Sequence, residues 1–136
     1  MLFRSLMMVK YMYEHHIDEY EWFMRADDDV YVRNDKLAGL LRSLNSSNDI
    51  YLGHAGTGAK KEKGKLQLLP GDNYCMGGPG MVLSQSVLRK LAPHIDHCLQ
   101  IAPKSYMHED VELGRCIRRY VGISCTWSYE VSFLLS

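Results

Sequence analysis

Apolar and polar residues follow two spacings along this chain, one typical of helices and one typical of strands. The clearest helical spacing lies in residues 34–44, where leucines recur at i, i+3, i+4 and i+7, as Leu37, Leu40, Leu41 and Leu44. The side chain of Asn34 can cap the start of this helix. We therefore expect an amphipathic helix whose leucine face packs on a sheet.

Three more helices are predicted around this one. Residues 2–19 form the first, with one stripe made of Phe3, Leu6, Met7, Lys10 and Tyr11. The second is capped by Ser84 and ends before Pro93. The third is capped by Asp110 and runs to about Tyr120.

Short apolar runs between these helices predict strands at 21–26, 50–52, 66–69 and 81–83. Alternating helices and strands indicate the α/β class, here a mixed sheet flanked by helices. The length of 136 residues falls within the usual range of about 100–150 for a domain. We therefore expect one domain, or part of one.

Charge excludes some classes of partner. Sixteen Lys and Arg residues balance 16 Asp and Glu residues, so no net field attracts nucleic acid or an anionic membrane surface. No segment approaches the ~20 consecutive apolar residues of a membrane-spanning helix. Neither nucleic acid nor a membrane is expected as a direct partner of this segment.

Cysteines and a sequon bear on the cellular compartment. The 4 cysteines include no C-x-x-C pair, so a zinc ribbon is not indicated, and three disulfide connectivities stay open. Asn45-Ser46-Ser47 is an N-glycosylation sequon, which matters only in a secretory compartment. Both features are compatible with a lumenal protein.

The most informative stretch is an apolar segment, from Trp22 onward, that ends in Asp27-Asp28-Asp29. In an extended backbone, Asp27 and Asp29 share a face while Asp28 points away. Paired carboxylates suit Mg²⁺ or Mn²⁺, ions that commonly take their remaining ligands from water and substrate phosphates. The sequence predicts a divalent-metal site and a phosphate-bearing donor, although an acidic turn after a strand would give the same letters.

Two further motifs each allow a structural and a functional interpretation. Gly77-Gly78-Pro79-Gly80 is either a simple tight turn or a place where a ligand approaches the backbone closely. Asp110, in His108-Glu109-Asp110, is either a helix cap or a general base that accepts a proton from an acceptor hydroxyl. The residues alone leave both choices open.

Taken together, these motifs resemble the β1,3-glycosyltransferase superfamily that includes Fringe and core 1 galactosyltransferase. The resemblance rests on the stretch from Trp22 to Val32, on the Gly77–Gly80 turn and on Glu109-Asp110-Val111. Arg-Ser-Leu-Asn-Ser-Ser, Cys-Met-Gly-Gly-Pro-Gly and Thr-Trp-Ser-Tyr-Glu (126–130) are similar to the chondroitin sulfate synthases, within their N-terminal β3-type domain. The resemblance covers nearly the whole chain.

The resemblance implies a partial GT-A nucleotide-sugar transferase fold and an inverting, metal-dependent hexosyltransferase. Asp27 and Asp29 match the acids that hold Mn²⁺ or another divalent cation against the diphosphate of a UDP-sugar. Asp110 matches the catalytic base, and the glycine turn lies beside donor and acceptor. The acceptor would be a growing glycosaminoglycan, chondroitin, while glucuronate and N-acetylgalactosamine both stay open as the donor sugar.

Other expectations follow from the same resemblance. Cys98 and Cys116, which flank the loop before Asp110, match a paired position in these families and are expected to form a disulfide. The substrate-binding residues are expected to be Gly77, Gly78, Gly80 and Trp127. The protein is expected in the Golgi lumen, as a single-pass type II membrane protein when full length. Residues 1–136 are then part of one catalytic domain truncated at both ends, expected to be inactive alone.

Two rival interpretations use the same residues differently. The chain could be a non-catalytic subunit, similar to a polymerising factor, that works in a complex with a chondroitin synthase. It could also be a carbohydrate-binding module in which Trp127 and Tyr129 stack on sugars without transfer. Retention of Asp110 together with the acidic triplet favours an enzyme over binding alone.

Overall fold

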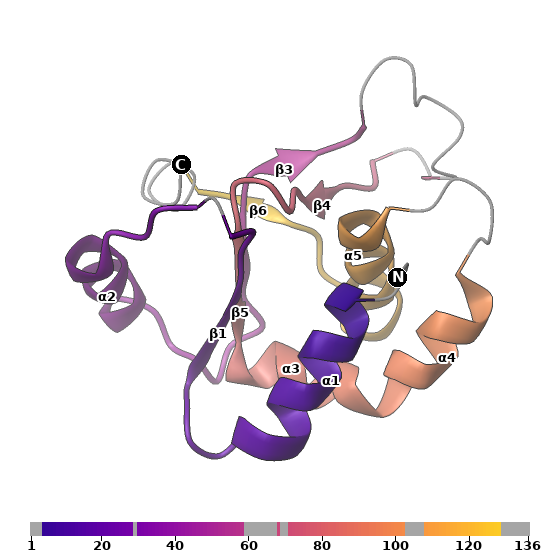
Figure 1. Ribbon diagram of the computed structural model, residues 1–136, viewed down its shortest axis with the longest axis horizontal. Coiled ribbons are helices and arrows are strands. Elements are labelled where there is room, and N and C mark those ends of the chain that lie inside the picture. The colour runs from indigo at the N-terminus through magenta and orange to yellow at the C-terminus, as the bar shows by residue number, and fades with distance from the viewer. Residues whose placement is uncertain (1–3, 29, 59–67, 69–70, 103–107, 129–136) are drawn as a thin grey trace.

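The structure is a computed structural model, and it describes residues 4–28, 30–58, 68, 71–102 and 108–128. Figure 1 shows a sheet in the middle of the molecule, with one helix on its left and the other helices on its right. The chain is thus a mixed α/β structure with a mixed sheet between helices, and the predicted fold class is confirmed at this level.

The main sheet contains strands that run in both directions. Its members, in spatial order, are β1 (Trp22–Arg25), β5 (Met81–Ser84), β2 (Tyr51–Gly53) and β6 (Thr126–Trp127). β5 is antiparallel to both β1 and β2, whereas β2 and β6 are parallel. A second, two-stranded antiparallel sheet is made of β3 (Ala55–Gly56) and β4 (Tyr74–Cys75).

Helices cover both faces of the main sheet. One face carries α1 (Arg4–His16), α3 (Gln85–Leu91), a short 3-10 helix (Ala92–His94), α4 (Ile95–Ile101) and α5 (Glu109–Tyr120), and the other carries α2 (Asn34–Arg42). Strand residues alternate between these layers, so that Leu83 belongs to the larger core and Val82 to the core under α2. The leucines of α2 pack in that second core, as predicted.

The predicted stripe on the first helix is confirmed at Leu6 and wrong at Met7 and Tyr11, while Phe3 lies outside the described residues. The buried residues of α1 are Ser5, Leu6 and Val9, whereas Met7 and Tyr11 are 50% and 57% exposed. Apolar residues occur on several sides of this helix, so the helical period alone does not select the face that meets the sheet. The packing partners of α1, chiefly α5 and α4, select it instead.

Two of the three predicted helix caps are also wrong. Asn34 is the first residue of α2 and Arg33 occupies the N-cap position, while Asp110 is the second residue of α5 behind the N-cap His108. Ser84 does cap α3, because its hydroxyl accepts a hydrogen bond from the Val87 amide. This helix ends at Leu91, before Pro93, as predicted. The strand expected at 66–69 falls almost entirely outside the described residues.

Two disulfides join distant parts of the chain. Cys98 of α4 is bonded to Cys116 of α5, which is the pair named from the resemblance. Cys75 of β4 is bonded to Cys125, directly before β6, a pairing that the sequence left open. All 4 cysteines are therefore paired.

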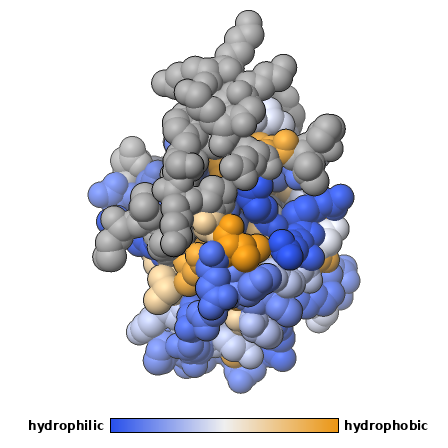
Figure 2. All heavy atoms as spheres, turned by 90° about the vertical axis from the view of Figure 1, so that its right-hand side faces the viewer, coloured by the Kyte–Doolittle hydropathy of each residue, from blue (hydrophilic) through white to orange (hydrophobic). Residues whose placement is uncertain are grey.

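The surface on the α4 side is mainly hydrophilic, with a small apolar patch near its centre (Figure 2). Among the residues that the structure describes, no helix is long and apolar enough to cross a membrane.

Candidate functional site

One end of the main sheet brings together most of the residues singled out from the sequence. Arg25 at the end of β1 lies opposite Met81 of β5, Met81 lies opposite Gly53 of β2, and Gly53 pairs with Trp127 of β6. The residues that follow β1 and β2, and the turn that precedes β5, therefore gather at one end of the sheet. Asp27 and Gly77–Gly80 belong to these segments.

The acidic triplet does not continue the strand. β1 ends at Arg25, and the Val30 amide donates a hydrogen bond to the Asp27 carbonyl at 3.3 Å, which closes a turn. Asp27 and Asp28 therefore do not continue the extended backbone that the alternation requires. Asp29 lies outside the described residues, so its convergence with Asp27 stays a prediction.

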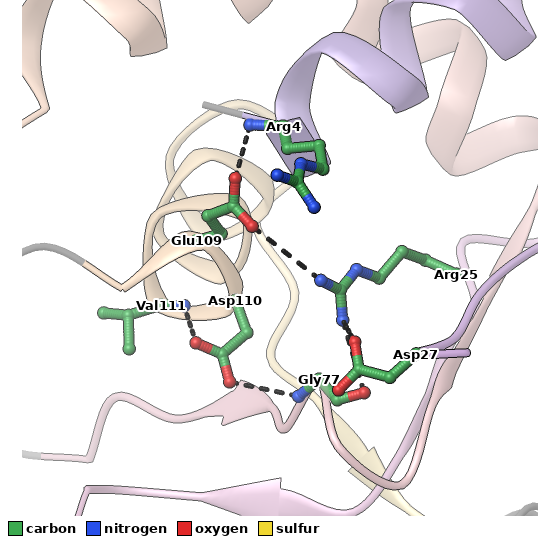
Figure 3. A network of polar contacts seen from close by, with 7 residues as sticks. All are labelled: Arg4, Arg25, Asp27, Gly77, Glu109, Asp110 and Val111. Carbon is green, nitrogen blue, oxygen red and sulfur yellow. Dashed lines mark hydrogen bonds and ion pairs between the residues drawn. The ribbon is translucent and has the colours of Figure 1, made fainter. Parts of the chain in front are cut away.

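Arg25 holds this end of the sheet together (Figure 3). Its Nη1 lies 3.0 Å from Asp27 Oδ1 and 3.3 Å from the Gly77 carbonyl oxygen, and its Nη2 lies 3.9 Å from Glu109 Oε2. Only 13% of its side chain is exposed. Because a guanidinium presents several donors in a fixed plane, one side chain can connect three segments here.

Glu109 and Asp110 point in different directions from the start of α5 (Figure 3). Glu109 accepts a hydrogen bond from the Arg4 amide and pairs with Arg25. Asp110 instead accepts from the Gly77 amide at 3.0 Å through Oδ2 and from the Val111 amide at 2.9 Å through Oδ1. Each carboxylate oxygen of Asp110 keeps a further lone pair that can accept a proton or a hydrogen bond.

Gly77 joins the two halves of the site. Its amide donates to Asp110, while its carbonyl accepts from Arg25, which in turn binds Asp27. A Cβ at this position would lie 2.5 Å from Arg25 Nη1, so a side chain would displace the guanidinium. Glycine at 77 therefore leaves room for the Arg25 guanidinium.

The other glycines of the turn have separate reasons. Gly80 adopts a φ of 95°, which side-chain-bearing residues rarely adopt. At Gly78 a Cβ would meet nothing within 4 Å, so this peptide borders open space. The role of Gly77, Gly78 and Gly80 in binding substrate stays a prediction.

Beneath the turn lies Tyr51, which is 1% exposed. Its hydroxyl oxygen accepts a hydrogen bond from the Cys75 amide at 2.8 Å. Burial raises the pKa of this phenol, and the negative charge of Asp110 raises it further, so Tyr51 is protonated at neutral pH. Its proton therefore stays on the phenol, and Tyr51 does not act as a base at neutral pH.

The chemistry of Asp27 fits a divalent cation. Its carboxylate is 43% exposed, and Arg25 contacts only Oδ1. The ions expected here bind through one or two carboxylates and complete their coordination with water and phosphate oxygens. Within the described part of the chain, no three His, Cys, Asp or Glu side chains converge as a metal cage.

Trp127 lies at the same end of the sheet, on β6, and its ring is packed against that of His54. The ring centroids are 4.0 Å apart, with the planes tilted by 59°. Asn45, the sequon residue, is exposed and lies beyond the end of α2, away from the site. Its Oδ1 accepts a hydrogen bond from the Ser47 amide.

Sequence reasoning missed Arg25 and Glu109 as parts of the site. The signal for Arg25 was a cationic residue at the end of an apolar strand, directly before three acids, where a half-buried charge needs partners. Glu109 gave a weaker signal, because acidic residues are common in the first turn of any helix. The Cys75–Cys125 pairing and the position of His54 depend on sheet register, which the sequence does not reveal.

This geometry agrees with the family that the chain matches. The model of the Fringe-like family matches residues 3–132, and the chain belongs to this family. Fringe-like domains have a GT-A-type glycosyltransferase fold, so the fold expected from the resemblance is confirmed.

Individual relatives agree with the family. The chain is 58% identical over 131 residues to chondroitin sulfate synthase 3 of Mus musculus, which covers 96% of this chain and 15% of that protein. It is 32% identical over 130 residues to chondroitin sulfate glucuronyltransferase of Homo sapiens, covering 90% of this chain and 15% of that protein. It is 28% identical over 115 residues to lunatic fringe, a β-1,3-N-acetylglucosaminyltransferase of Danio rerio, and this match covers 79% of this chain and 31% of that protein. The resemblance to chondroitin synthases is thus confirmed, and the chain spans about 15% of the length of these synthase relatives.

Proposed function

We propose that this chain forms part of the catalytic centre of a glycosyltransferase that extends chondroitin. The observation that carries the proposal is the link through Gly77, whose amide binds the carboxylate at the start of α5 and whose carbonyl binds Arg25, the partner of the carboxylate after β1. A displacement reaction needs one group at the leaving phosphate and another at the attacking hydroxyl. Asp27 and Asp110 supply these two groups.

Asp27 would hold a divalent cation, Mn²⁺ or a similar ion, through the oxygen that Arg25 leaves free, with Asp29 as the second expected ligand. When bound, such an ion neutralises the charge that develops on a departing diphosphate. Arg25 fixes the direction of the Asp27 carboxylate. UDP is the expected carrier of the sugar, because the resemblance is to enzymes that use UDP-sugars.

Asp110 acts as the general base in this proposal. An acceptor hydroxyl gives its proton to the carboxylate of Asp110 while its oxygen bonds to the anomeric carbon of the donor sugar. The bond from that carbon to the phosphate oxygen breaks, and UDP leaves. A single displacement of this kind inverts the anomeric configuration. The amides of Gly77 and Val111 keep the carboxylate in place.

The cellular setting is part of the proposal. The relatives named chondroitin synthases are expected to be Golgi enzymes, and two disulfides agree with an oxidising compartment. We propose a type II protein of the Golgi lumen, with glucuronate or N-acetylgalactosamine as the transferred sugar. Asn45 is exposed and available for N-glycosylation there.

The test is a transfer assay on the intact protein with a chondroitin oligosaccharide acceptor. UDP-glucuronate and UDP-N-acetylgalactosamine are supplied separately, with Mn²⁺ and with a chelator. We expect transfer from one of the donors, abolished by the chelator and reduced at least about tenfold by Asp27→Asn, which removes an anionic ligand. Arg89→Gln, far from the site in a surface ion pair, serves as the control.

If neither donor supported transfer, the proposal that the protein is a glycosyltransferase would be contradicted. If the intact protein then raised the activity of an added chondroitin synthase, the rival role as a non-catalytic partner would replace it.

A further inference from the structure

We infer that Trp127, braced by His54, forms a stacking subsite for a sugar ring of the acceptor chain. The inference rests on the proposed function and names a part of the site that takes the saccharide and not the nucleotide. Trp127 is an exposed aromatic residue on a segment that neighbouring contacts hold in place.

The segment that carries Trp127 is fixed on both sides. Before it, Cys125 is bonded to Cys75, and both its amide and its carbonyl bind the side-chain amide of Asn73, at 2.8 and 3.1 Å. After it, the Ser128 amide donates to the Gly53 carbonyl at 3.0 Å. The platform therefore needs little ordering when a ligand binds, which lowers the entropic cost of binding.

The ring of Trp127 is also held in place. His54 packs against it with a centroid separation of 4.0 Å. The residue nevertheless stays 41% exposed on an edge strand whose two residues are both exposed. A single exposed apolar residue needs no explanation, but a rigidly mounted indole next to a reaction site is a surface on which a flat ligand face can stack.

Short covalent and hydrogen-bonded links connect this platform to the proposed base. The His54 carbonyl accepts from the Met76 amide at 2.9 Å, and the next amide, that of Gly77, donates to Asp110. The disulfide joins the residue before Met76 to the residue before Thr126. Figure 1 shows β3, β4 and β6 together near the end of α5 that carries this base.

The chemistry of the platform suits a saccharide. A pyranose ring presents C–H groups on one face, and these pack on the face of an indole while the hydroxyls stay in water. The nucleotide diphosphate is expected at Asp27, beyond Arg25, whereas Trp127 lies on the opposite edge strand of the main sheet from β1. The acceptor chain, which must reach Asp110, is therefore the occupant we assign to Trp127.

Calorimetry on the intact protein tests this assignment with two separate probes. One titration uses a chondroitin hexasaccharide without donor, and the other uses UDP with Mn²⁺. We expect Trp127→Ala to weaken hexasaccharide binding at least about tenfold, since it removes the stacking surface. His54→Ala, which removes only the brace, should weaken it by a smaller factor of about three. UDP binding should change less than about twofold in both variants.

The chain offers a matched control in its other tryptophan. Trp22 lies at the opposite end of the sheet, paired with Ser84, so Trp22→Phe should leave both titrations unchanged. Trp127→Phe keeps an aromatic face and should restore most of the lost affinity.

Unchanged hexasaccharide binding in Trp127→Ala would overturn the subsite, as would a parent protein that binds UDP with Mn²⁺ but not the hexasaccharide. If the parent bound the hexasaccharide through Trp127 and yet bound no UDP, the subsite would stand and the proposed transferase would fall.

Discussion

Arg25 is the residue on which the geometry of the site depends most. Its guanidinium contacts Asp27, Glu109 and the Gly77 carbonyl from a position that is mostly buried. Arg25→Gln removes the charge that these acids share, and hydrogen bonds to charged groups are worth about 1.5–3 kcal/mol each. We expect the free energy of unfolding to fall by about 2 kcal/mol in urea titrations. Arg25→Lys should lower the free energy of unfolding by less than Arg25→Gln does, because lysine keeps the charge but cannot contact all three partners at once.

The control for this prediction is Arg89→Gln. Arg89 pairs with Asp18 at 3.0 Å, but the two side chains are 53% and 84% exposed. Exposed pairs contribute about 0–1 kcal/mol, so this variant should barely change stability. Equal losses in the two variants would show that Arg25 has no special role.

For individual residues, the sequence predicts the chemical role of a side chain better than it predicts the atoms that the side chain contacts. The acids at 27 and 110 are recognisable because they occur together with the glycine turn in the order that the family motifs share, whereas a carboxylate at a helix start is common by itself. Which atom meets which is decided by the tertiary structure. The turn closed by Val30 and Asp27 was one of two alternatives, because the same acids fit an extended backbone and a turn equally well, and the sequence could not choose between them.

Among the elements, α5 packs unusually close to the small sheet. A Cβ added at Gly114 would lie 2.5 Å from the Tyr74 Cβ and 3.1 Å from its Cα. Gly114→Ala should therefore push α5 away from β4 and lower the free energy of unfolding by about 1–3 kcal/mol, the usual cost of overpacking. Because α5 carries Asp110, transfer activity should fall as well.

The same substitution, glycine to alanine, should have the opposite effect on stability at Gly39. It lies in α2, where a Cβ would meet nothing within 4 Å. Gly39→Ala should stabilise the protein by about 0.5–1 kcal/mol through helix propensity. Thermal unfolding of the two variants should move in opposite directions, and a shift of the same sign in both would contradict the packing of α5 on β4.

How well each element could be predicted depends on its length and on how it is buried. The leucine spacing identified α2, and Ser84 identified the start of α3, because both are local signals. The strands β3, β4 and β6 have two residues each, too few to show a period. α4 was missed because it follows the 3-10 helix at Pro93 without a cap of its own.

At the scale of the whole molecule, the two disulfides differ in what they hold. Cys75–Cys125 closes a separation of 50 residues and Cys98–Cys116 one of 18. In the entropy model these are worth about 4 and 3 kcal/mol. Urea titrations should therefore show a larger fall in the free energy of unfolding when Cys75 and Cys125 are both replaced by alanine than when Cys98 and Cys116 are.

The two pairs should also differ in function. The first pair anchors β6 beside the Gly77 turn, so its loss should weaken chondroitin binding beyond the loss of stability. The second pair joins α4 to α5 away from Trp127, and its loss should leave oligosaccharide affinity unchanged at temperatures where the protein is folded. Equal oligosaccharide affinity in both double variants would contradict this division.

The whole architecture was the most predictable level of all. Alternating helical and strand spacings gave the α/β class, and the motifs together gave the family. The position of β6, parallel to β2, could not be derived, because it depends on a disulfide and on the Asn73 side chain far away in the sequence.

The central claim is that Asp110 is the base of a glycosyl transfer whose nucleotide is bound elsewhere in the site. The measurement is a pair of quantities on the intact protein with Asp110→Asn: turnover with a chondroitin acceptor, and the affinity for UDP with Mn²⁺. Asparagine preserves the shape but keeps only one of the two acceptor oxygens, so it can bind the Gly77 amide or the Val111 amide and not both, and it cannot take a proton. Removing a general base typically costs ~10²–10⁴ in rate. We predict turnover reduced by about this factor with UDP affinity unchanged, whereas Asp27→Asn should reduce both. Retention of more than about a tenth of turnover in Asp110→Asn would contradict the account, and Asp110 would then be a residue that only fixes Gly77 to α5.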